Sequence, residues 1–348
     1  MENLLGEGKY GQVFECDEHS NCAIKKFSSQ LETLREAFFF SCLDDKFFPK
    51  LHEVRECEIH MELFADQVPL EKKERKLPPE HILFSLASAI YYLHSRQICH
   101  GDIRHQNILF RENRVVLCDF SLSFIGPEAQ FCCGDDLYGS PESKARTGVQ
   151  SDDIYAFGVY ALQILASPIY LIPGNFRRQI LVLGLTSPEP KVEGFSILPE
   201  EQKDLICSCL LPKLTRPSIS EVLNKLTTCF PNYHQVSIEL PIPLVECEKE
   251  AQFLYSLLLQ EKKLTELNFS LQDIIPVCNF RKKIQEKFNW PEAECLFIAL
   301  CVYFIVSDSL FVYKPLSQMF QLEEENPIGK MLQVFNSRFY RQFCHYFR

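Results

Sequence analysis

A short polar stretch, residues 100–107 with the sequence HGDIRHQN, constrains this chain more than any other part of it. Asp102 and Asn107 lie in this stretch, and the apolar run at residues 115–118 leads directly into Asp119. Because a short apolar run is consistent with a buried strand, we expect these three side chains to converge near a strand end. Phosphoryl transfer uses such a set: one carboxylate receives a hydroxyl proton, while an amide and a second carboxylate hold Mg²⁺ on a nucleotide. The alternative is that Asp102 and Asn107 only form turns.

Composition limits the classes of protein that the chain can belong to. With 348 residues, of which 46% are hydrophobic and 24% charged, it can bury a large core. This length suits two domains, or one of about 230 residues with an appendage. The net charge of −10 argues against nucleic acid as a partner, because duplex binders neutralise phosphates with Lys and Arg.

Cysteine usage predicts the compartment. The sixteen cysteines are scattered without a framework of spacings, which is typical of reduced thiols in an intracellular protein of the cytoplasm or nucleus. Cys132 and Cys133 are adjacent, and Cys207 and Cys209 are separated by one residue. Neither pair has the two-residue gap that presents two thiolates to zinc, so we expect no metal cluster.

Neither a secretory signal nor a membrane span is expected. Glycines at positions 6 and 8 interrupt any apolar run at the start of the chain. Residues 154–172 include Gly158 and Pro168, and the apolar run at residues 295–306 is shorter than the roughly twenty residues that a span needs. Both stretches are therefore predicted to be buried helices.

A glycine pattern, GEGKYGQV, occupies residues 6–13. Glycines at Gly6, Gly8 and Gly11 allow backbone N–H groups to approach phosphate oxygens without a Cβ in the way. A dinucleotide-binding site would need a helix directly after the glycines. Here residues 12–16 and 22–25 are typical of strands, so the pattern predicts a β-hairpin.

These motifs follow one another over about residues 1–230 and together resemble the eukaryotic-type protein kinases. Residues 6–13 resemble the glycine-rich loop of that family, residues 100–107 its catalytic loop, and residues 118–121 its metal-binding turn. The resemblance implies an α+β bilobal fold, with a small β-rich N-lobe and a larger helical C-lobe. It also implies ATP and Mg²⁺ as cofactors and a protein as substrate.

The resemblance implies roles for individual residues. Asp102 would be the catalytic base, Asn107 and Asp119 the metal ligands, and Arg104 would offset charge on the transferred group. Lys25 would contact the nucleotide phosphates and pair with a glutamate of the helical stretch at residues 30–43. Two glutamates compete for this pairing; Glu36 is preferred to Glu32, because its spacing to Leu43 matches the family. The implied nucleotide-binding residues are Gly6, Gly8, Gly11, Val13, Ala23, Lys25, Met61, Glu62 and Phe64.

Three further positions match structural residues of the family. Asp153 would hold the backbone of the catalytic loop and is preferred to its neighbour Asp152. Arg216 would pair with Glu142 of the Ser-Pro-Glu segment. These residues are scaffold predictions rather than catalytic ones.

The chain departs from the family pattern at Gly101 and at a linked pair of positions, Arg104 and Asp135. Gly101 stands where most members have arginine, so we expect activity without phosphorylation of the activation segment. Arg104 stands at the position of a lysine, and Asp135 at that of the threonine which bonds to this lysine. We interpret this as one exchange that creates an Arg104–Asp135 pair. Independent drift in a kinase that has lost catalysis is the alternative.

Ser121 replaces the glycine that usually follows the Asp-Phe pair of the metal-binding turn. Serine enters positive φ less readily than glycine, so we expect flipping of this turn to cost about 1 kcal/mol more. Such a turn is compatible with activity.

The end of the chain is predicted to be helical. Residues 231–246 are expected to form a connector and residues 247–348 an all-α region. Residues 288–300 faintly resemble the central helix of a cyclin box, and a generic helical regulatory extension is the alternative. A regulatory protein is a candidate partner for these helices.

The predicted function is transfer of the ATP γ-phosphoryl group to serine or threonine hydroxyls of proteins. A pseudokinase scaffold is the alternative, favoured by Gly101, Ser121 and Asp135. A kinase-like enzyme acting on small molecules is disfavoured by the presence of Glu142 and Arg216. The compact kinase-like region and altered motifs also suggest a divergent, viral member, whose location would be the host cell.

Overall fold

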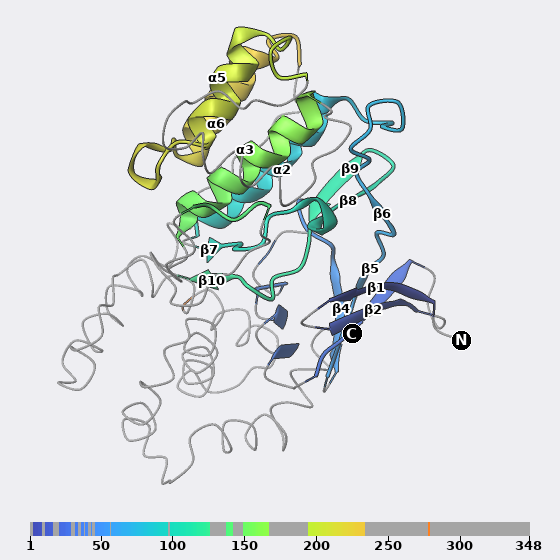
Figure 1. Ribbon diagram of the computed structural model, residues 1–348. Helices are drawn as coiled ribbons and strands as arrows, with labels where there is room; N and C mark the ends of the chain where they lie inside the picture. The colour runs from blue at the N-terminus through green and yellow to red at the C-terminus, as the bar shows by residue number, and fades with distance from the viewer. Residues whose placement is uncertain are drawn as a thin grey trace, which may run out of the picture. The chain divides into compact units, whose positions relative to one another are not determined.

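The structure is a computed structural model, and Figure 1 shows how its elements are arranged. It describes residues 3–8, 11–16, 21–28, 32–33, 36–37, 39–40, 43, 46–55, 57–96, 98–125, 137–141, 149–166, 194–233 and 278. The described residues up to 63, apart from 46–48, belong to one compact unit. Residues 46–48 and the described residues from 64 to 233 belong to a second compact unit.

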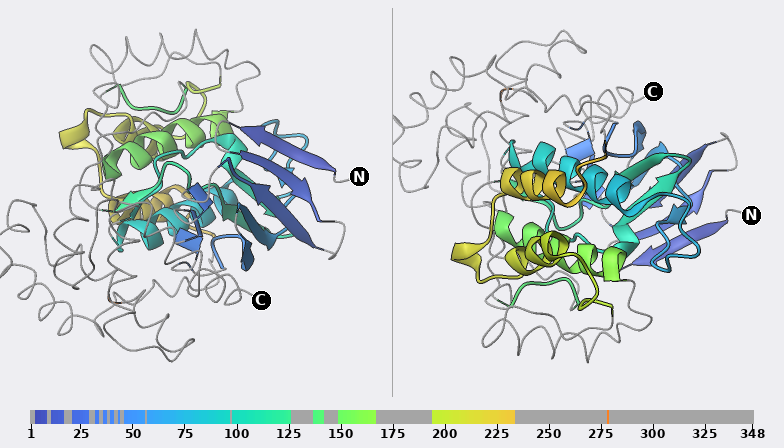
Figure 2. Two further views of the ribbon diagram at one scale, coloured as in Figure 1. Left: turned by 90° about the horizontal axis from the view of Figure 1, so that it is seen from below. Right: turned by 90° about the horizontal axis from the view of Figure 1, so that it is seen from above.

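The first unit contains a five-stranded antiparallel sheet with the order β1-β2-β3-β5-β4. Its strands are β1 (Leu4–Gly8), β2 (Gly11–Glu15), β3 (Cys22–Lys26), β4 (Leu51–Arg55) and β5 (Glu58–Glu62). Figure 2 shows these strands, in blue, from two further sides. The hairpin predicted around the glycine pattern is confirmed, because β1 pairs with β2 through Gly8 and Gly11.

The register of this sheet sorts its side chains onto two faces. Val13 lies opposite Lys25, and Ala23 lies opposite Met61. Since successive side chains of a strand point to opposite faces, all four residues share one face. The next positions along each strand, such as Ile24 opposite His60, share the other face.

The stretch at residues 30–43, predicted to be helical, is described only in part. Residues 32–33, 36–37 and 39–40 are helical. Among them, Thr33, Ala37 and Phe39 are fully buried. The described part of this stretch is therefore helical, as predicted, and buries these three side chains, while Leu34 and Phe38 of the predicted apolar face lie outside the described residues.

Helices dominate the second unit. They are α2 (Pro79–His94), α3 (Gln150–Ala166), α5 (Glu200–Cys209) and α6 (Ile219–Cys229). Within this unit, α2 packs against α3 and α6, while α5 packs against α3 and α6, and Figure 1 shows the four helices side by side. In the sequence, Pro78 and Pro79 precede apolar residues at helical spacing, which predicts a helix over residues 80–95 with an apolar stripe. This helix is confirmed as α2, with Pro79 in its first turn. All six residues of its predicted apolar stripe are buried, namely Ile82, Leu83, Leu86, Ala89, Ile90 and Leu93.

Short strands and one helical turn position the polar stretch at residues 100–107. β7 (Ile98–Cys99) precedes it and pairs with β10 (Phe124–Ile125). The turn η1 (His105–Asn107) ends it and leads into β8 (Ile108–Arg111). β8 lies between β6 (Asp66–Gln67) and β9 (Arg114–Leu117). Because β9 ends two residues before Asp119, the apolar run at residues 115–118 is confirmed as a strand that leads to this carboxylate.

A glycine allows α3 and α5 to approach closely. A Cβ built at Gly158 of α3 would lie 2.5 Å from the Cβ of Cys209 in α5. Any larger residue would therefore force the two helices apart. Among the described helices, none is both long and apolar enough to cross a membrane. The buried helix predicted over residues 154–172 is confirmed over residues 154–166, which belong to α3.

The last described residues of the second unit are fixed to its helices. The ring of His81 in α2 lies between the hydroxyl of Tyr233 at 2.7 Å and the carbonyl oxygen of Asn113 at 2.6 Å. Tyr233 also stacks on Phe84, with ring centroids 5.1 Å apart. The short turn η3 (Lys213–Thr215) and helix α6 precede this contact.

The predicted connector at residues 231–246 and helical region at residues 247–348 lie outside the described residues, apart from 231–233 and 278. The same holds for the cyclin-like stretch at residues 288–300. The predicted domain boundaries therefore stay predictions.

Candidate catalytic site

A buried ion pair in the first unit joins Lys25 of β3 to Glu36. The Nζ atom of Lys25 lies 2.6 Å from Oε2 and 2.9 Å from Oε1 of Glu36. The side chains are only 7% and 1% exposed. The competing candidate, Glu32, instead accepts a hydrogen bond from Ser28. Of the two glutamates that the sequence left open, the structure brings Glu36 to the lysine.

The predicted nucleotide-binding residues of the sheet share the face of Lys25. Val13 and Ala23 lie on this face beside the lysine, and Met61 of β5 lies opposite Ala23. Small and apolar side chains next to a lysine suit a purine ring and its phosphates. The backbone N–H of Glu62 is bonded to the carbonyl oxygen of Lys50 at 2.8 Å, which fixes the backbone at the end of β5.

The glycines of the β1–β2 hairpin divide into two groups. A Cβ built at Gly6 or Gly8 meets no atom within 4 Å, which leaves room for a ligand to approach the backbone. Gly11 has φ of 149°, and a Cβ there would collide with the carbonyl oxygen of Lys26. Gly11 is therefore required by the hairpin itself.

Phe64, predicted to contact the nucleotide through its backbone, belongs to the second unit. Its buried ring lies 4.9 Å from the guanidinium carbon of Arg111 and 5.2 Å from that of Arg114. These contacts fix the ring and hence the backbone at this residue.

In the second unit, Asp102 and Asn107 are joined directly. The Nδ2 group of Asn107 donates to the Asp102 carbonyl oxygen at 2.8 Å and to Asp102 Oδ2 at 2.9 Å. The Nε atom of Arg104 lies 3.2 Å from the same Oδ2. Asn107 and Arg104 therefore both contact the carboxylate of Asp102. The predicted partner of Arg104, Asp135, lies outside the described residues.

Burial raises the pKa of the Asp102 carboxyl above its ordinary value. The Arg104 guanidinium opposes this shift, while the nearby charge of Asp119 adds to it. A raised pKa makes a carboxylate a better proton acceptor near neutral pH. The environment of Asp102 therefore suits a general base.

The predicted metal-binding turn holds the Asp119 carboxylate through the serine that replaces glycine. Asp119 has a positive φ of 69°, a conformation that Asp adopts more readily than most residues. Its Oδ1 accepts hydrogen bonds from the Ser121 hydroxyl at 2.6 Å and from the Ser121 N–H at 3.3 Å. Phe120 between them is fully buried against the rings of Phe48 and His100. Ser121 thus adds a donor that glycine cannot supply.

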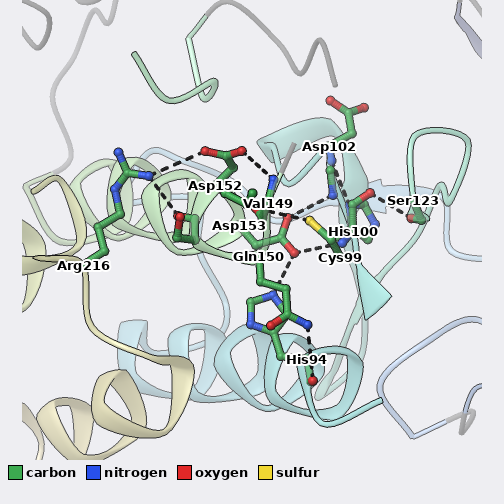
Figure 3. A network of polar contacts seen from close by, with 12 residues as sticks. His94, Cys99, His100, Asp102, Ser123, Val149, Gln150, Asp152, Asp153 and Arg216 are labelled. Atoms are coloured by element: carbon green, nitrogen blue, oxygen red, sulfur yellow. Dashed lines mark hydrogen bonds and ion pairs between the residues drawn. The ribbon is translucent and has the colours of Figure 1, made fainter. Parts of the chain in front are cut away.

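Asp153 of α3 organises the start of the catalytic stretch (Figure 3). Its carboxylate accepts the backbone N–H groups of His100 at 2.8 Å and Gly101 at 2.9 Å, and it lies 2.9 Å from the Nε2 atom of His94. Burial opposes ionisation, but the hydrogen bond and charge of His94 together with the amides lower the pKa of Asp153 below its ordinary value. The structure therefore places Asp153 where the sequence predicted it.

The ring of His100 is bonded to the backbone at or next to the two predicted functional carboxylates, Asp102 and Asp119. Its Nε2–H donates to the carbonyl oxygen of Cys118 at 3.1 Å, one residue before Asp119. Its Nδ1 accepts the backbone N–H of Asp102 at 3.3 Å. Full burial lowers the pKa of His100, which favours the neutral ring that these two bonds need. Asp102 and Asp119 are thus both positioned relative to one imidazole.

The backbone explains the glycine that replaces arginine in this loop. Gly101 has φ of 78°, in the left-handed region where a side chain costs about 1 kcal/mol or more. Glycine therefore relieves strain at this position and leaves the N–H directed at Asp153.

Asp152, which sequence reasoning ranked below its neighbour, has a separate structural role. It accepts hydrogen bonds from the Ser140 hydroxyl at 2.6 Å and the Val149 N–H at 3.0 Å. Its Oδ1 lies 3.6 Å from Arg216 Nη1. Burial raises the pKa of Asp152, in contrast to that of Asp153. Glu142, the predicted partner of Arg216, lies outside the described residues, while Arg216 pairs with Asp152.

Two partners of the site were missed by sequence reasoning. His94 at the end of α2 contacts Asp153, and the Ser123 hydroxyl donates to the His100 carbonyl oxygen at 2.8 Å. His94 is the basic residue in the last turn of a helix that leads into the catalytic stretch, which is the one signal that pointed to it.

Comparison with known proteins agrees with this arrangement. The profile of the protein kinase domain family matches residues 1–226. RasGEF domain-containing serine/threonine-protein kinase X of Dictyostelium discoideum is 26% identical over 271 residues, which cover 65% of this chain and 26% of that protein. Aurora kinase of Candida glabrata is 26% identical over 242 residues, covering 61% of this chain and 65% of the relative. Aurora kinase of Saccharomyces cerevisiae is 29% identical over 187 residues, covering 46% and 51%.

Because the family profile covers well over half of its length, the chain belongs to the protein kinase domain family. The antiparallel sheet of the first unit and the helices of the second are the parts of the kinase fold that the described residues contain. The matches cover less than two thirds of each of the three relatives named above.

Proposed function

We propose that this chain transfers the γ-phosphoryl group of ATP to serine and threonine hydroxyls of protein substrates. The observation that carries the proposal is the Asp102 carboxylate, buried and contacted by both Asn107 and Arg104. The family implies a protein substrate. The choice of serine and threonine is supported by relatives whose names include serine/threonine-protein kinase.

The residues present fit ATP and Mg²⁺. Carboxylate and amide oxygens are the ligands that Mg²⁺ prefers, and Asp119 and Asn107 supply one of each. The Nδ2 group of Asn107 is bonded to Asp102, so Oδ1 is its metal-binding atom. Bound Mg²⁺ would neutralise negative charge on the nucleotide phosphates.

Three side chains would have separate roles in phosphoryl transfer. Asp102 orients the acceptor hydroxyl and takes its proton, and its raised pKa favours this step. Lys25, held by Glu36, contacts the phosphates as a fixed positive charge. Arg104 carries a second positive charge beside Asp102 and offsets charge on the moving group.

The test is phosphate transfer from labelled Mg-ATP to the chain itself and to basic and acidic protein substrates. Asp102→Ala and Asp119→Ala are measured beside the wild type, and the modified amino acid is identified. We expect transfer to serine or threonine that falls by about a hundredfold or more in Asp102→Ala. Glu200→Ala, on the exposed side of α5, is the control variant and is expected to retain activity.

Two outcomes would contradict the proposal. Nucleotide binding without transfer by the wild type would indicate a pseudokinase, and transfer to tyrosine would refute the assigned specificity. Pretreatment with phosphatase tests the role of Gly101 separately. Activity should survive this treatment, because Gly101 provides no positive side chain to receive a phosphorylated activation segment.

A further inference from the structure

Three side chains that can bind a metal converge on the first unit, on the face of the sheet opposite Lys25. Cys16 directly follows β2, Cys22 begins β3, and His60 lies in β5. One ligand atom from each residue lies within 4.8 Å of the other two. None of the three residues is more than 7% exposed.

Strand pairing, rather than sequence spacing, brings these residues together. The N–H of Cys16 donates to the carbonyl oxygen of Cys22 at 2.9 Å, which continues the β2–β3 ladder by one residue. His60 lies opposite Ile24, and Ile24 is two residues from Cys22 on the same face. Diagonal neighbours of this kind are within reach of long side chains. The ligand atoms therefore come from three adjacent strands.

We propose that Cys16, Cys22 and His60 bind one Zn²⁺ ion in a structural site. Thiolate and imidazole are the ligands that select this d¹⁰ cation. Most structural zinc sites have four protein ligands; here a water molecule would complete the tetrahedron of three protein ligands. With Zn–S bonds of about 2.3 Å, a tetrahedral site separates two sulfurs by about 3.8 Å. The three ligand atoms therefore need to close by about 1 Å at most.

Charge balance favours such an ion in a buried position. On binding, each thiol releases its proton to solvent as two Zn–S bonds and one Zn–N bond form. Two thiolates then cancel the two positive charges of Zn²⁺, and the imidazole adds none. The bound ion therefore leaves no uncompensated buried charge.

The surroundings of His60 are those of a metal ligand. Its Nε2 atom lies 3.4 Å from the Glu58 carboxylate, and metal-bound histidines commonly donate their second ring N–H to such a group. This contact leaves Nδ1 for the metal. Arg55 is nearby, but its guanidinium is paired with Glu53 at 3.1 Å.

The site would connect the strands that carry the predicted nucleotide-binding residues. Cys22 is adjacent to Ala23, whose side chain lies on the opposite face with Lys25. An ion bound to Cys16, Cys22 and His60 would link β2, β3 and β5. The expected role is therefore to stabilise this sheet, not to take part in chemistry.

The experiment titrates the full, metal-stripped, reduced chain with Co²⁺ as a spectroscopic probe for Zn²⁺. We expect thiolate-to-cobalt charge-transfer bands that saturate at one Co²⁺ per chain and disappear when Zn²⁺ is added. Cys16→Ser, Cys22→Ser and His60→Gln should weaken binding by at least about tenfold. Cys57→Ser is the matched control, because this half-buried thiol directly precedes β5 but lies outside the cluster.

Thermal unfolding with and without Zn²⁺ is the second measurement. Zn²⁺ should raise the Tm of the wild type and of Cys57→Ser, since a ligand that binds only the folded state stabilises it. At the same Zn²⁺ concentration it should raise the Tm of His60→Gln, which keeps both thiols, by less than that of the wild type. A wild-type chain without charge-transfer bands would overturn the proposal even if the cysteine variants do not fold. Full Co²⁺ binding by folded Cys22→Ser, or a Cys16–Cys22 disulfide in the chain as isolated, would also overturn it.

Discussion

The two units bury a charged carboxylate in different ways. In the first, the carboxylate of Glu36 is paired with the ammonium of Lys25 at 2.6 Å. In the second, Asp153 is compensated by two backbone N–H groups and by His94. Removing Lys25 takes away the positive charge that stabilises Glu36, whereas removing one donor to Asp153 leaves the others in place. Loss of one partner should therefore destabilise the fold more in the first unit than in the second.

The largest effect is expected from Lys25→Met. This change leaves Glu36 buried without its cation, and breaking a buried pair in this way costs roughly 3–5 kcal/mol. Loss of a charge that contacts the phosphates should also lower kcat by about a hundredfold. Urea unfolding and initial rates of phosphate transfer measure the two effects.

The double variant Lys25→Met/Glu36→Leu separates these effects. Replacing both charges by apolar groups should recover most of the stability but none of the activity, because an apolar pair has no unmet charge. If the double variant were as unstable as Lys25→Met, the single-pair description of this region would be wrong.

Asp153→Asn should have a smaller effect, with a distinctive pH dependence. The variant keeps one acceptor oxygen but loses the negative charge that faces His94, at a cost of about 2–3 kcal/mol near pH 7. The pKa of Asp153 is lowered in the folded state, so its stabilisation is present above the unfolded value of about 3.9. It is lost as pH falls below that value towards the folded pKa. The difference in unfolding free energy between wild type and variant should shrink accordingly as pH falls below about 3.9.

Asp152→Asn is the matched control, since the neighbouring carboxyl has the opposite pKa shift. Burial raises the pKa of Asp152, so its favourable contribution is present below the unfolded pKa and is lost as pH rises through the folded pKa. Relative to wild type, this variant should gain stability as pH rises. Parallel pH profiles for the two variants would refute the contrast.

Ser121→Ala tests the donor at the metal-binding turn. Removing the hydroxyl that lies 2.6 Å from Asp119 should cost about 1 kcal/mol of carboxylate positioning, which corresponds to about fivefold in the Mg²⁺ concentration needed for half-maximal transfer. Rates measured across a Mg²⁺ series give this value. Ser121→Gly should match or exceed the effect, and a variant with unchanged Mg²⁺ dependence would show that the hydroxyl has no such role.

The smallest effect is expected from Ser218→Ala at the start of α6. Ser218 and Glu221 form a capping box, and loss of such a cap costs about 1 kcal/mol. This helix carries none of the proposed catalytic residues, so the rate of transfer should not change. Thermal unfolding and the transfer assay together check that a loss of stability in the second unit does not by itself reduce activity.

Local patterns in the sequence predicted the elements well. The apolar spacing and the paired prolines identified α2, and the glycine pattern identified the β1–β2 hairpin. The sequence also predicts a strand over residues 57–63, and it corresponds to β5, which is one residue shorter at each end. These features depend on neighbours in the chain, and such neighbours are visible in any sequence.

Contacts between distant segments could not be predicted in the same way. His94 reaches Asp153 from another helix, and Arg216 reaches Asp152 from beyond α5. The expectation that no metal cluster exists considered only cysteines close in sequence, whereas Cys16, Cys22 and His60 meet through strand register. The group that pairs with a buried charge or thiol depends on how distant segments pack, and local sequence spacing does not predict this packing.

The contact of Tyr233 with His81 and Phe84 determines where an expressed fragment of this chain should end. The family match ends at residue 226, inside α6, and the predicted kinase domain ends at residue 230. A fragment that stopped at either position would lose a ring stacked at 5.1 Å and a hydroxyl bonded to His81. Expression of this domain alone should therefore extend at least through Tyr233.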